Sequence, residues 1–357
     1  MISKQQLSDD LIIENNNKLV QLWLLSGCFL IFSMLLIGGV TRLTNSGLSI
    51  TEWNLVGGII PPLSEGQWQE KFKIYQQFPE YQLLHSHFTL ADFKFIFFWE
   101  YLHRLVGRII GFVFIIPFIY FIHTTKFQKG FIKKVILLFF LGGLQGFLGW
   151  FMVKSGLVDQ PNVSHYRLAI HLVMAFVLFS FTFWLYLELK PKTNSISNKN
   201  LSTILWIFLF FIFFQIIFGA FVAGLDAGKI YNTFPKLGNN WIPNEIGEYF
   251  NKQGFVSLFD YAVSVQFIHR YLAKILFIFF IAIYFIFIKQ PISSSQKFGL
   301  NLILLIFILQ ILLGIFTLLY SVPLLLGVMH QLLALILVAS VLFAIRGEGV
   351  DSLRVQS

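Results

Sequence analysis

The stretch Phe95-Ile-Phe-Phe-Trp-Glu-Tyr-Leu-His-Arg-Leu-Val-Gly-Arg108 begins a largely apolar run that continues to Ile122. A helix rises about 1.5 Å per residue, so a helix of this length can cross the roughly 30 Å of hydrocarbon in a bilayer. No water inside the bilayer can satisfy a bare backbone, which leaves the α-helix for a single apolar run. The run therefore predicts a transmembrane helix that carries a glutamate, a histidine and two arginines into the membrane.

Seven further runs give the chain eight predicted spans. They cover Leu19–Val40, Phe95–Ile122, Val135–Val153, Leu168–Leu187, Leu201–Ala223, Val263–Ile288, Phe298–Tyr320 and Leu324–Ile345. Of the 357 residues, 57% are hydrophobic and only 12% are charged, against about 25% charged in a soluble domain. These features predict an all-α integral membrane protein whose partner is the lipid bilayer. The net charge of +9 is scattered between the runs and forms no basic patch, so no nucleic-acid partner is expected.

Lysine and arginine are distributed unequally between two sets of connecting segments. The segments with the higher density are 1–18, 123–134, 189–200, 289–298 and 346–357. The other set, which has less than half that density, comprises 41–94, 154–166 and 224–262. Basic segments stay on the cytoplasmic side of a membrane. We therefore expect cytoplasmic tails at both termini and two long loops that face outward.

The chain also repeats its own motifs in the same order. Glu100-Tyr-Leu-His103-Arg104-Leu-Val-Gly-Arg108 parallels Gln266-Phe-Ile-His269-Arg270-Tyr-Leu-Ala-Lys274, and Leu144-Gln145-x-x-Leu148-Gly149 recurs as Leu309-Gln310-x-x-Leu313-Gly314. Each half has an even number of spans, so the halves would share one orientation, as in a parallel repeat. We predict two pseudo-symmetric four-helix bundles, residues 19–190 and 201–345, joined by a cytoplasmic linker at 191–200.

Four histidines lie at one depth in the even-numbered spans, namely His103, His171, His269 and His330. Each is close to the outer end of its span, which places the imidazoles roughly 5–12 Å below the outer boundary. Ionisable residues inside a membrane are candidates for function, and histidines on facing helices of a bundle can hold a metal or a haem. The single cysteine, Cys28, excludes a Cys-based metal site. Two imidazoles in a Phe-rich surround suit a haem iron, with one site in each half.

The other four histidines carry a weaker signal. His85 and His87 form a His-x-His pair in the first long outer loop, His123 starts a cytoplasmic loop, and His165 lies at a membrane interface. We interpret the pair as solvated polar sequence and assign no role to any of the four.

Basic residues follow the first histidine of each half at matching offsets. They are Arg104 and Arg108 in the first half and Arg270 and Lys274 in the second. A buried cation costs on the order of 3 kcal/mol unless it is paired. Two explanations stay open, because either porphyrin propionates or ordinary ion pairs and snorkelling would satisfy these side chains.

The repeat differs at one position that bears on chemistry. Glu100 stands one helical turn before His103, whereas the matching residue before His269 is Gln266. The difference suggests that one site performs chemistry that needs a carboxylate while the other only holds its cofactor. An ion pair between Glu100 and Arg104 is the structural alternative.

The combined motifs resemble the haem A synthase family over nearly the whole chain, from Leu19 to about Ile345. The motifs are Gly38-Gly-Val-Thr-Arg-Leu-Thr-Asn-Ser-Gly-Leu-Ser-Ile-Thr-Glu-Trp53, the stretch from Phe95 to Arg108, Gln266-Phe-Ile-His-Arg270 and Met329-His-Gln331. They are most similar to the branch of alpha-proteobacteria and mitochondria. Other branches carry cysteine pairs in outward loops, and this sequence has none.

This resemblance implies an enzyme that oxidises a methyl group of haem O to a formyl group, which gives haem A for cytochrome oxidase. It implies a resident haem b on His269 and His330, a substrate haem on His103 and His171, and a catalytic role for Glu100. It further implies a bacterial inner-membrane location with haem sites toward the outer face. Haem O synthase, a protoporphyrin farnesyltransferase, would supply the substrate, an electron-transfer partner would be needed, and a homo-oligomer is compatible with the resemblance.

Two other classes of protein remain as alternatives. A di-haem b-type cytochrome would use the same histidines only to move electrons. A transporter would also fit a parallel repeat, but it would need broken helices near the midplane, and Pro117 stands alone in its span.

Overall fold

A computed structural model describes residues 4–51, 59–124, 130–154, 163–190 and 197–347. Within these ranges the regular elements are helices, and eight of them are long and apolar enough to cross a membrane. They are α1 (Lys4–Leu43), α3 (Leu90–Thr124), α4 (Phe131–Lys154), α5 (His165–Glu188), α6 (Lys199–Gly224), α9 (Ala262–Phe287), α10 (Ser294–Leu319) and α11 (Leu324–Arg346). The all-α fold class and the eight predicted spans are confirmed.

Most of the spanning helices extend beyond the predicted spans because their first turns are polar. α10 begins at Ser294, where Ser293 and Gln296 form a capping box, and hydropathy alone does not detect such a start. α1 includes much of the predicted tail at 1–18. Of the predicted linker and C-terminal tail, residues 191–196 and 348–357 lie outside the described ranges.

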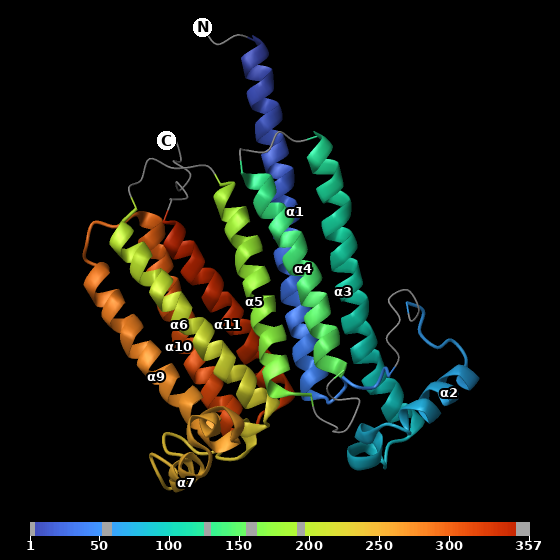
Figure 1. The fold of residues 1–357 in the computed structure, drawn as a ribbon. Coiled ribbons are helices and arrows are strands. Elements are labelled where there is room, and N and C mark those ends of the chain that lie inside the picture. Colours follow the sequence, from blue (N-terminus) through green and yellow to red (C-terminus); the bar gives the residue numbers. More distant parts are fainter. Residues whose placement is uncertain (1–3, 52–58, 125–129, 155–162, 191–196, 348–357) are drawn as a thin grey trace. The chain divides into compact units, whose positions relative to one another are not determined.

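The chain divides into two compact units, which are residues 1–167 with 174–189 and residues 168–173 with 190–357. In the first unit α1 packs along α3, and α3 packs against α4 (Figure 1). The core that these helices share with α5 comprises Val20, Trp23, Leu24, Phe121, Phe131, Val135, Leu138, Leu178 and Leu185. The pseudo-symmetry between the two halves stays a prediction.

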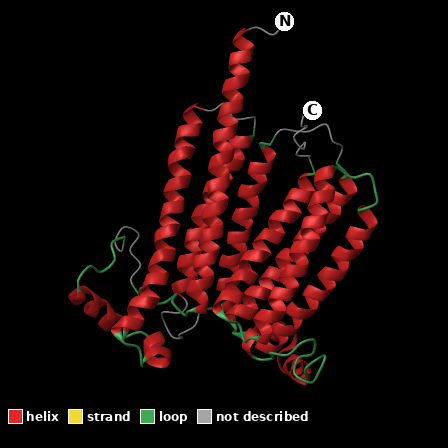
Figure 2. Ribbon diagram, turned by 180° about the vertical axis from the view of Figure 1, so that it is seen from behind, coloured by secondary structure: helices red, strands yellow, loops and turns green. Residues whose placement is uncertain are grey.

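The second unit is a four-helix bundle. α6 packs against α9 and α11, and α10 packs against α9 and α11, so the four helices enclose one core (Figures 1 and 2). Phe208 lies at its centre, with ring centroids 5.3 Å from Phe280 and 6.0 Å from Phe307. The short helix α7 (Asn244–Gln253) lies beyond one end of the bundle, in the long loop between α6 and α9.

A small extramembrane subdomain covers the start of α3. Its helix α2 (Glu65–Tyr75) begins with a capping box of Ser64 and Gln67. The subdomain packs through an aromatic cluster in which Trp68 meets Phe97 edge-on with ring centroids 5.0 Å apart. His85, interpreted from sequence as solvated, is buried here with 7% of its surface exposed, whereas His87 is exposed as expected. That interpretation was wrong for His85 because the chain folds back on α3 and encloses it.

Candidate functional site

Each histidine of the second-half pair lies against a glycine of a neighbouring helix. A Cβ added to Gly219 on α6 would stand 3.1 Å from Cε1 of His269 on α9, and a Cβ added to Gly314 on α10 would stand 2.8 Å from Cε1 of His330 on α11. The two glycines therefore provide the space that the imidazole rings occupy.

Two glutamines fix the backbone that carries these histidines. Gln215 donates from Nε2 to the carbonyl oxygen of His269 at 3.0 Å, and Gln310 donates from Nε2 to the carbonyl oxygen of His330 at 3.1 Å. Each glutamine lies four residues before the glycine that contacts the same histidine. On one helix face, Gln-x-x-x-Gly thus holds the backbone of a histidine and makes room for its ring.

The ring nitrogens of the two histidines differ in their contacts. Nδ1 of His269 lies 3.0 Å from Nε2 of Gln215, and Nε2 of His330 lies 3.5 Å from Nε2 of Gln310. Nδ1 of His330 is buried and has no hydrogen-bond partner among the described residues. An imidazole nitrogen of this kind is the donor that a porphyrin iron takes in its axial positions. His330 on α11 thus offers a free nitrogen to a haem iron, and His269 on α9 can offer one if its ring exchanges the contact with the Gln215 amide for the iron.

The two cations of the second half have different surroundings. Nη2 of Arg270 donates to the carbonyl oxygens of Thr233 at 2.8 Å, Pro235 at 3.1 Å and Lys236 at 3.0 Å. Its Nε and Nη1 are buried and lack a partner within the described ranges, so they remain available for an anion such as a propionate. Nζ of Lys274 instead lies 4.3 Å from the ring centroid of Tyr271, an arrangement typical of a cation–π contact.

The first-half histidines lie in different units of the fold. A Cβ added to Gly38 of α1 would stand 3.1 Å from Cε1 of His103 on α3, the same contact that Gly219 makes with His269. His171 lies in the segment 168–173, which belongs to the second unit, and its neighbour Ala169 packs with Phe218 there. The pairing of His103 with His171 stays a prediction.

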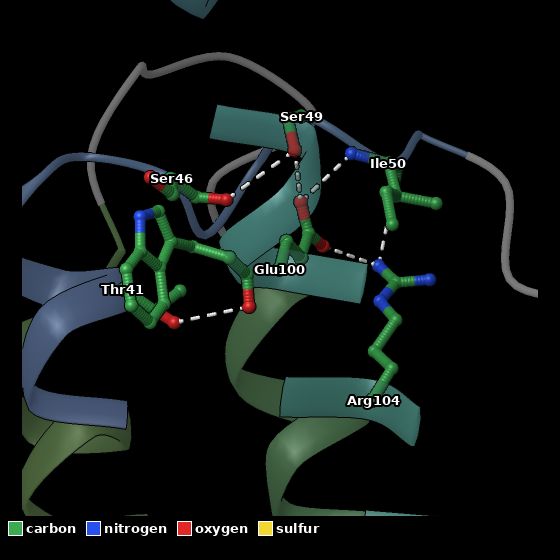
Figure 3. A network of polar contacts seen from close by, with 7 residues as sticks. Thr41, Ser46, Ser49, Ile50, Glu100 and Arg104 are labelled. Atoms are coloured by element: carbon green, nitrogen blue, oxygen red, sulfur yellow. Dashed lines mark hydrogen bonds and ion pairs between the residues drawn. The ribbon is translucent and has the colours of Figure 1, made fainter. Parts of the chain in front are cut away.

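Glu100 is at the centre of a hydrogen-bond network at the loop after α1 (Figure 3). Only 3% of its surface is exposed. Its Oε2 accepts from Ser49 Oγ at 2.7 Å and from the backbone N–H of Ile50 at 2.8 Å, and its Oε1 accepts from Nη2 of Arg104 at 2.6 Å. The ion pair considered as an alternative from the sequence is therefore formed, and it includes a loop that the sequence did not indicate.

Arg104 and Arg108 differ in the same way as the cations of the second half. Nη2 of Arg104 donates to Glu100 and also to the carbonyl oxygen of Ile50 at 2.9 Å, so this arginine holds the loop. Nη1 of Arg108 is buried and has no hydrogen-bond partner in the described part of the chain. Of the two, Arg108 has the donor that could still bind an anion.

Gln266 makes the corresponding contact in the second half with reversed polarity. Its Nε2 donates to the carbonyl oxygen of Tyr231 at 3.2 Å, in the loop that follows α6. A carboxylate therefore faces an N–H donor in one half, and an amide donor faces a carbonyl in the other. The side chain at this position therefore matches the backbone group opposite it in each half. This match is a structural reason for the Glu/Gln difference, separate from any role in catalysis.

Several residues of these sites were given no role from the sequence alone. Gln215, Ser49 and Ile50 had no role assigned, and Gln310 was noted only as part of a repeated motif. The recurrence of Gln-x-x-x-Gly at 145–149, 215–219 and 310–314 was a signal that could have indicated the glutamines. Ser49 carried no comparable signal.

Within the ranges described above, eight helices long and apolar enough to cross a membrane define a polytopic helical membrane protein, and four of these helices carry the histidines predicted as haem ligands. The family described as cytochrome oxidase assembly protein matches residues 21–342, and the chain belongs to this family. It is 48% identical to a protein named heme A synthase from Flavobacterium psychrophilum, over 92% of this chain and 98% of that one. A heme A synthase from Flavobacterium johnsoniae is 44% identical over 93% and 98%, and one from Rickettsia bellii is 42% identical over 90% and 96%. The resemblance inferred from the motifs is confirmed.

Proposed function

We propose that this chain is a haem A synthase that oxidises a methyl group of haem O to the formyl group of haem A. The observation that carries the proposal is the likeness to proteins named heme A synthase along more than nine-tenths of both chains. The buried carboxylate three residues from an intramembrane histidine supports it, because Glu100 and His103 lie on the same helix.

We assign the second unit to a resident haem b. His269 and His330 would hold its iron, and the free donors of Arg270 would bind a propionate. Lys274 contributes positive charge nearby, although its ammonium already lies against Tyr271. A haem b held there would supply one-electron transfer.

We assign the substrate haem to His103 and His171. Arg108 is the better candidate for a substrate propionate, since Arg104 is engaged by Glu100 and the Ile50 carbonyl. This choice narrows the expectation from the sequence, in which both arginines were equivalent.

The reaction requires protons and electrons to leave the substrate. Whatever the source of the oxygen atom, the step from a hydroxymethyl to a formyl group releases two protons and two electrons. Glu100 can take a proton at its carboxylate, which is the work of a general base. The network around Glu100 holds that carboxylate in one position through three donors. The electrons would pass to an external electron-transfer partner.

The proposed setting follows from this role. We place the chain in the bacterial inner membrane with cytoplasmic termini, and the haem sites toward the outer face. Haem O synthase would deliver the substrate, and a homo-oligomer is compatible with this setting.

A di-haem b-type cytochrome stays the alternative. The Glu100/Gln266 difference argued against it, but the loop contacts give that difference a structural cause as well. A haem A synthase and a b-type cytochrome would contain different haems when purified.

Haem extraction and mass analysis test the proposal. The protein, purified from cells that supply haem O, should yield haem b together with haem O, haem A or the hydroxylated intermediate. His269→Ala and His330→Ala should each abolish the low-spin b-type absorbance, while His87→Ala, which changes an exposed residue, should keep it. Haem b alone in the parent protein would favour the cytochrome, and full haem b in both histidine variants would refute the assignment of that site.

A further inference from the structure

Three buried polar side chains form a hydrogen-bonded chain in the subdomain between α1 and α3. The Tyr75 hydroxyl donates to Oε2 of Glu80 at 3.0 Å and lies 2.7 Å from Nδ1 of His85. Their exposed fractions are 0%, 4% and 7%. Buried polar groups of this kind need partners, and here each supplies one for the next. No role in haem binding explains them.

The protonation of this trio is set by its surroundings. Burial raises the pKa of the Glu80 carboxyl to about 8. The hydrogen bond from Tyr75 opposes this increase, and the nearby Glu100 carboxylate adds to it. Burial, followed by Glu80 and Glu100, raises the pKa of the Tyr75 phenol, and burial lowers the pKa of His85. The other titratable groups that act on the trio are Tyr81 and the exposed His87.

We infer that Tyr75, Glu80 and His85 form a proton relay between Glu100 and the water on the side of the membrane where α2 lies. The inference rests on the proposed function, in which Glu100 accepts protons from the substrate. Tyr75 packs in one cluster with Phe93, Ile96 and Phe97, which lie on α3 in the turns before Glu100. Ile50, whose backbone N–H Glu100 accepts, packs against the same cluster. The relay requires a water molecule between the carboxylates of Glu100 and Glu80.

Each transfer along the relay conserves protons and moves no electrons. Glu80 in its acid form donates its proton to the Tyr75 oxygen, while the Tyr75 hydroxyl proton passes to Nδ1 of His85. His85 then loses the proton from Nε2 to water. The Tyr75 hydroxyl can donate in either direction, because a phenol both donates and accepts.

The subdomain offers a matched control for its own packing. Tyr81 belongs to the same aromatic cluster, with its ring centroid 5.7 Å from that of Tyr75, and its hydroxyl donates to the carbonyl oxygen of Ser86 at 3.2 Å. Tyr81→Phe therefore removes a hydroxyl from the cluster without interrupting the relay, whereas Tyr75→Phe keeps the ring and breaks the relay.

The test measures haem A formation in spheroplasts that contain haem O, with the external pH set by buffer. We expect Tyr75→Phe to lower the rate at least about tenfold with parental amounts of protein and b-type absorbance, since proton transfer by a positioned group contributes about 10²–10⁴-fold. Tyr81→Phe should run at the parental rate. His85→Ala should be slow and should recover when imidazole is added outside, because a small base can replace the missing ring.

A parental rate in Tyr75→Phe would overturn the relay, and so would an equal loss in Tyr81→Phe. Failure of imidazole to restore any rate to a His85→Ala protein with normal haem b would also overturn it. These outcomes are distinct from failure of the proposed function, which would appear as no haem A from the parent protein.

Discussion

The Glu100 carboxylate accepts the backbone N–H of Ile50 at 2.8 Å, so a residue of a membrane helix fixes the loop that follows another helix. Gln266 in the second half donates to the carbonyl of Tyr231 instead. The carboxylate and the amide are each suited to the backbone group opposite them. A single carboxylate thus has two possible functions, namely to position the loop and to accept protons.

Glu100→Gln is the substitution that separates these two functions. The amide oxygen can still accept from Ser49 and Ile50, but it is no longer a base, and it loses the charge opposite Arg104. We expect a folded protein with parental haem b and a haem A rate lowered about 10²–10⁴-fold, with haem O or its hydroxylated form accumulating. Haem extraction at fixed times measures this.

Glu100→Ala should be less stable than Glu100→Gln. Both variants remove the charge opposite Arg104, but Ala also leaves the Ser49 hydroxyl and the Ile50 N–H without their acceptor, and each buried unsatisfied donor costs about 1–3 kcal/mol. Glu188→Gln is the control, since Glu188 pairs with Lys134 at the other end of the first unit. Near-parental haem A output from a well-folded Glu100→Gln protein would eliminate the catalytic role and leave only the structural one.

Gly314→Ala should lower the haem b content of the purified protein. The added Cβ would lie 2.8 Å from Cε1 of His330, closer than carbon atoms can pack, and an imidazole bound to iron could not move away. Gly146→Ala on α4 is the matched control, since a Cβ there meets nothing within 4 Å. The ratio of b-type absorbance to protein should fall for Gly314→Ala and stay constant for Gly146→Ala. Equal ratios in the two variants would contradict the inference that Gly314 makes room for the ring of His330.

The subdomain of α2 should lose stability as the pH rises. Glu80 has a pKa raised from 4.5 to about 8, so the folded state binds its proton more tightly than the unfolded state does. That contribution is complete below the unfolded value and is lost as the pH passes through about 8. The pKa of His85 is lowered, so His85 makes the subdomain more stable as the pH rises, but only near and below its ordinary pKa of 6.5. Above pH 6.5 the change in stability therefore reports on Glu80.

Amide hydrogen exchange in α2, corrected for intrinsic rates, measures this dependence. Protection should decrease between about pH 6.5 and 9 in the parent and should be flat in Glu80→Gln. The helix α7 provides a comparison, because the hydrogen bond from Tyr231 lowers the pKa of Glu245 and gives no titration in this window. Rising protection in α2 would contradict the assigned direction.

The orientation of the chain can be tested with single cysteines in a Cys28→Ser background. Gly66→Cys and Asn239→Cys place a thiol at exposed positions in the two long loops, and Gly66 is preferable to Ser64, which caps α2. Both should react with an impermeant thiol reagent in intact spheroplasts. Gln290→Cys, in a loop predicted to be cytoplasmic, should react only after lysis. The reverse pattern would invert the topology and the side on which the proposed relay opens.

The sequence by itself determined the eight membrane helices and the positions of the four histidines along them. Length and apolar character are properties of each segment alone, and a bilayer allows such a segment one backbone structure. The motifs also determined the family, because side-chain types at fixed spacing can be read without a fold.

Only the tertiary structure decided which groups these side chains contact. The spacing of four residues indicated that Glu100 could pair with Arg104. Ser49 and Ile50 contact Glu100 only because the loop after α1 folds back over α3, which the spacing did not indicate. His85 is buried beside Tyr75 for a similar reason, since the turn after α2 packs on the start of α3. A hydrogen bond depends on distances of about 3 Å between atoms far apart in the chain, and such distances are set by packing rather than by local pattern.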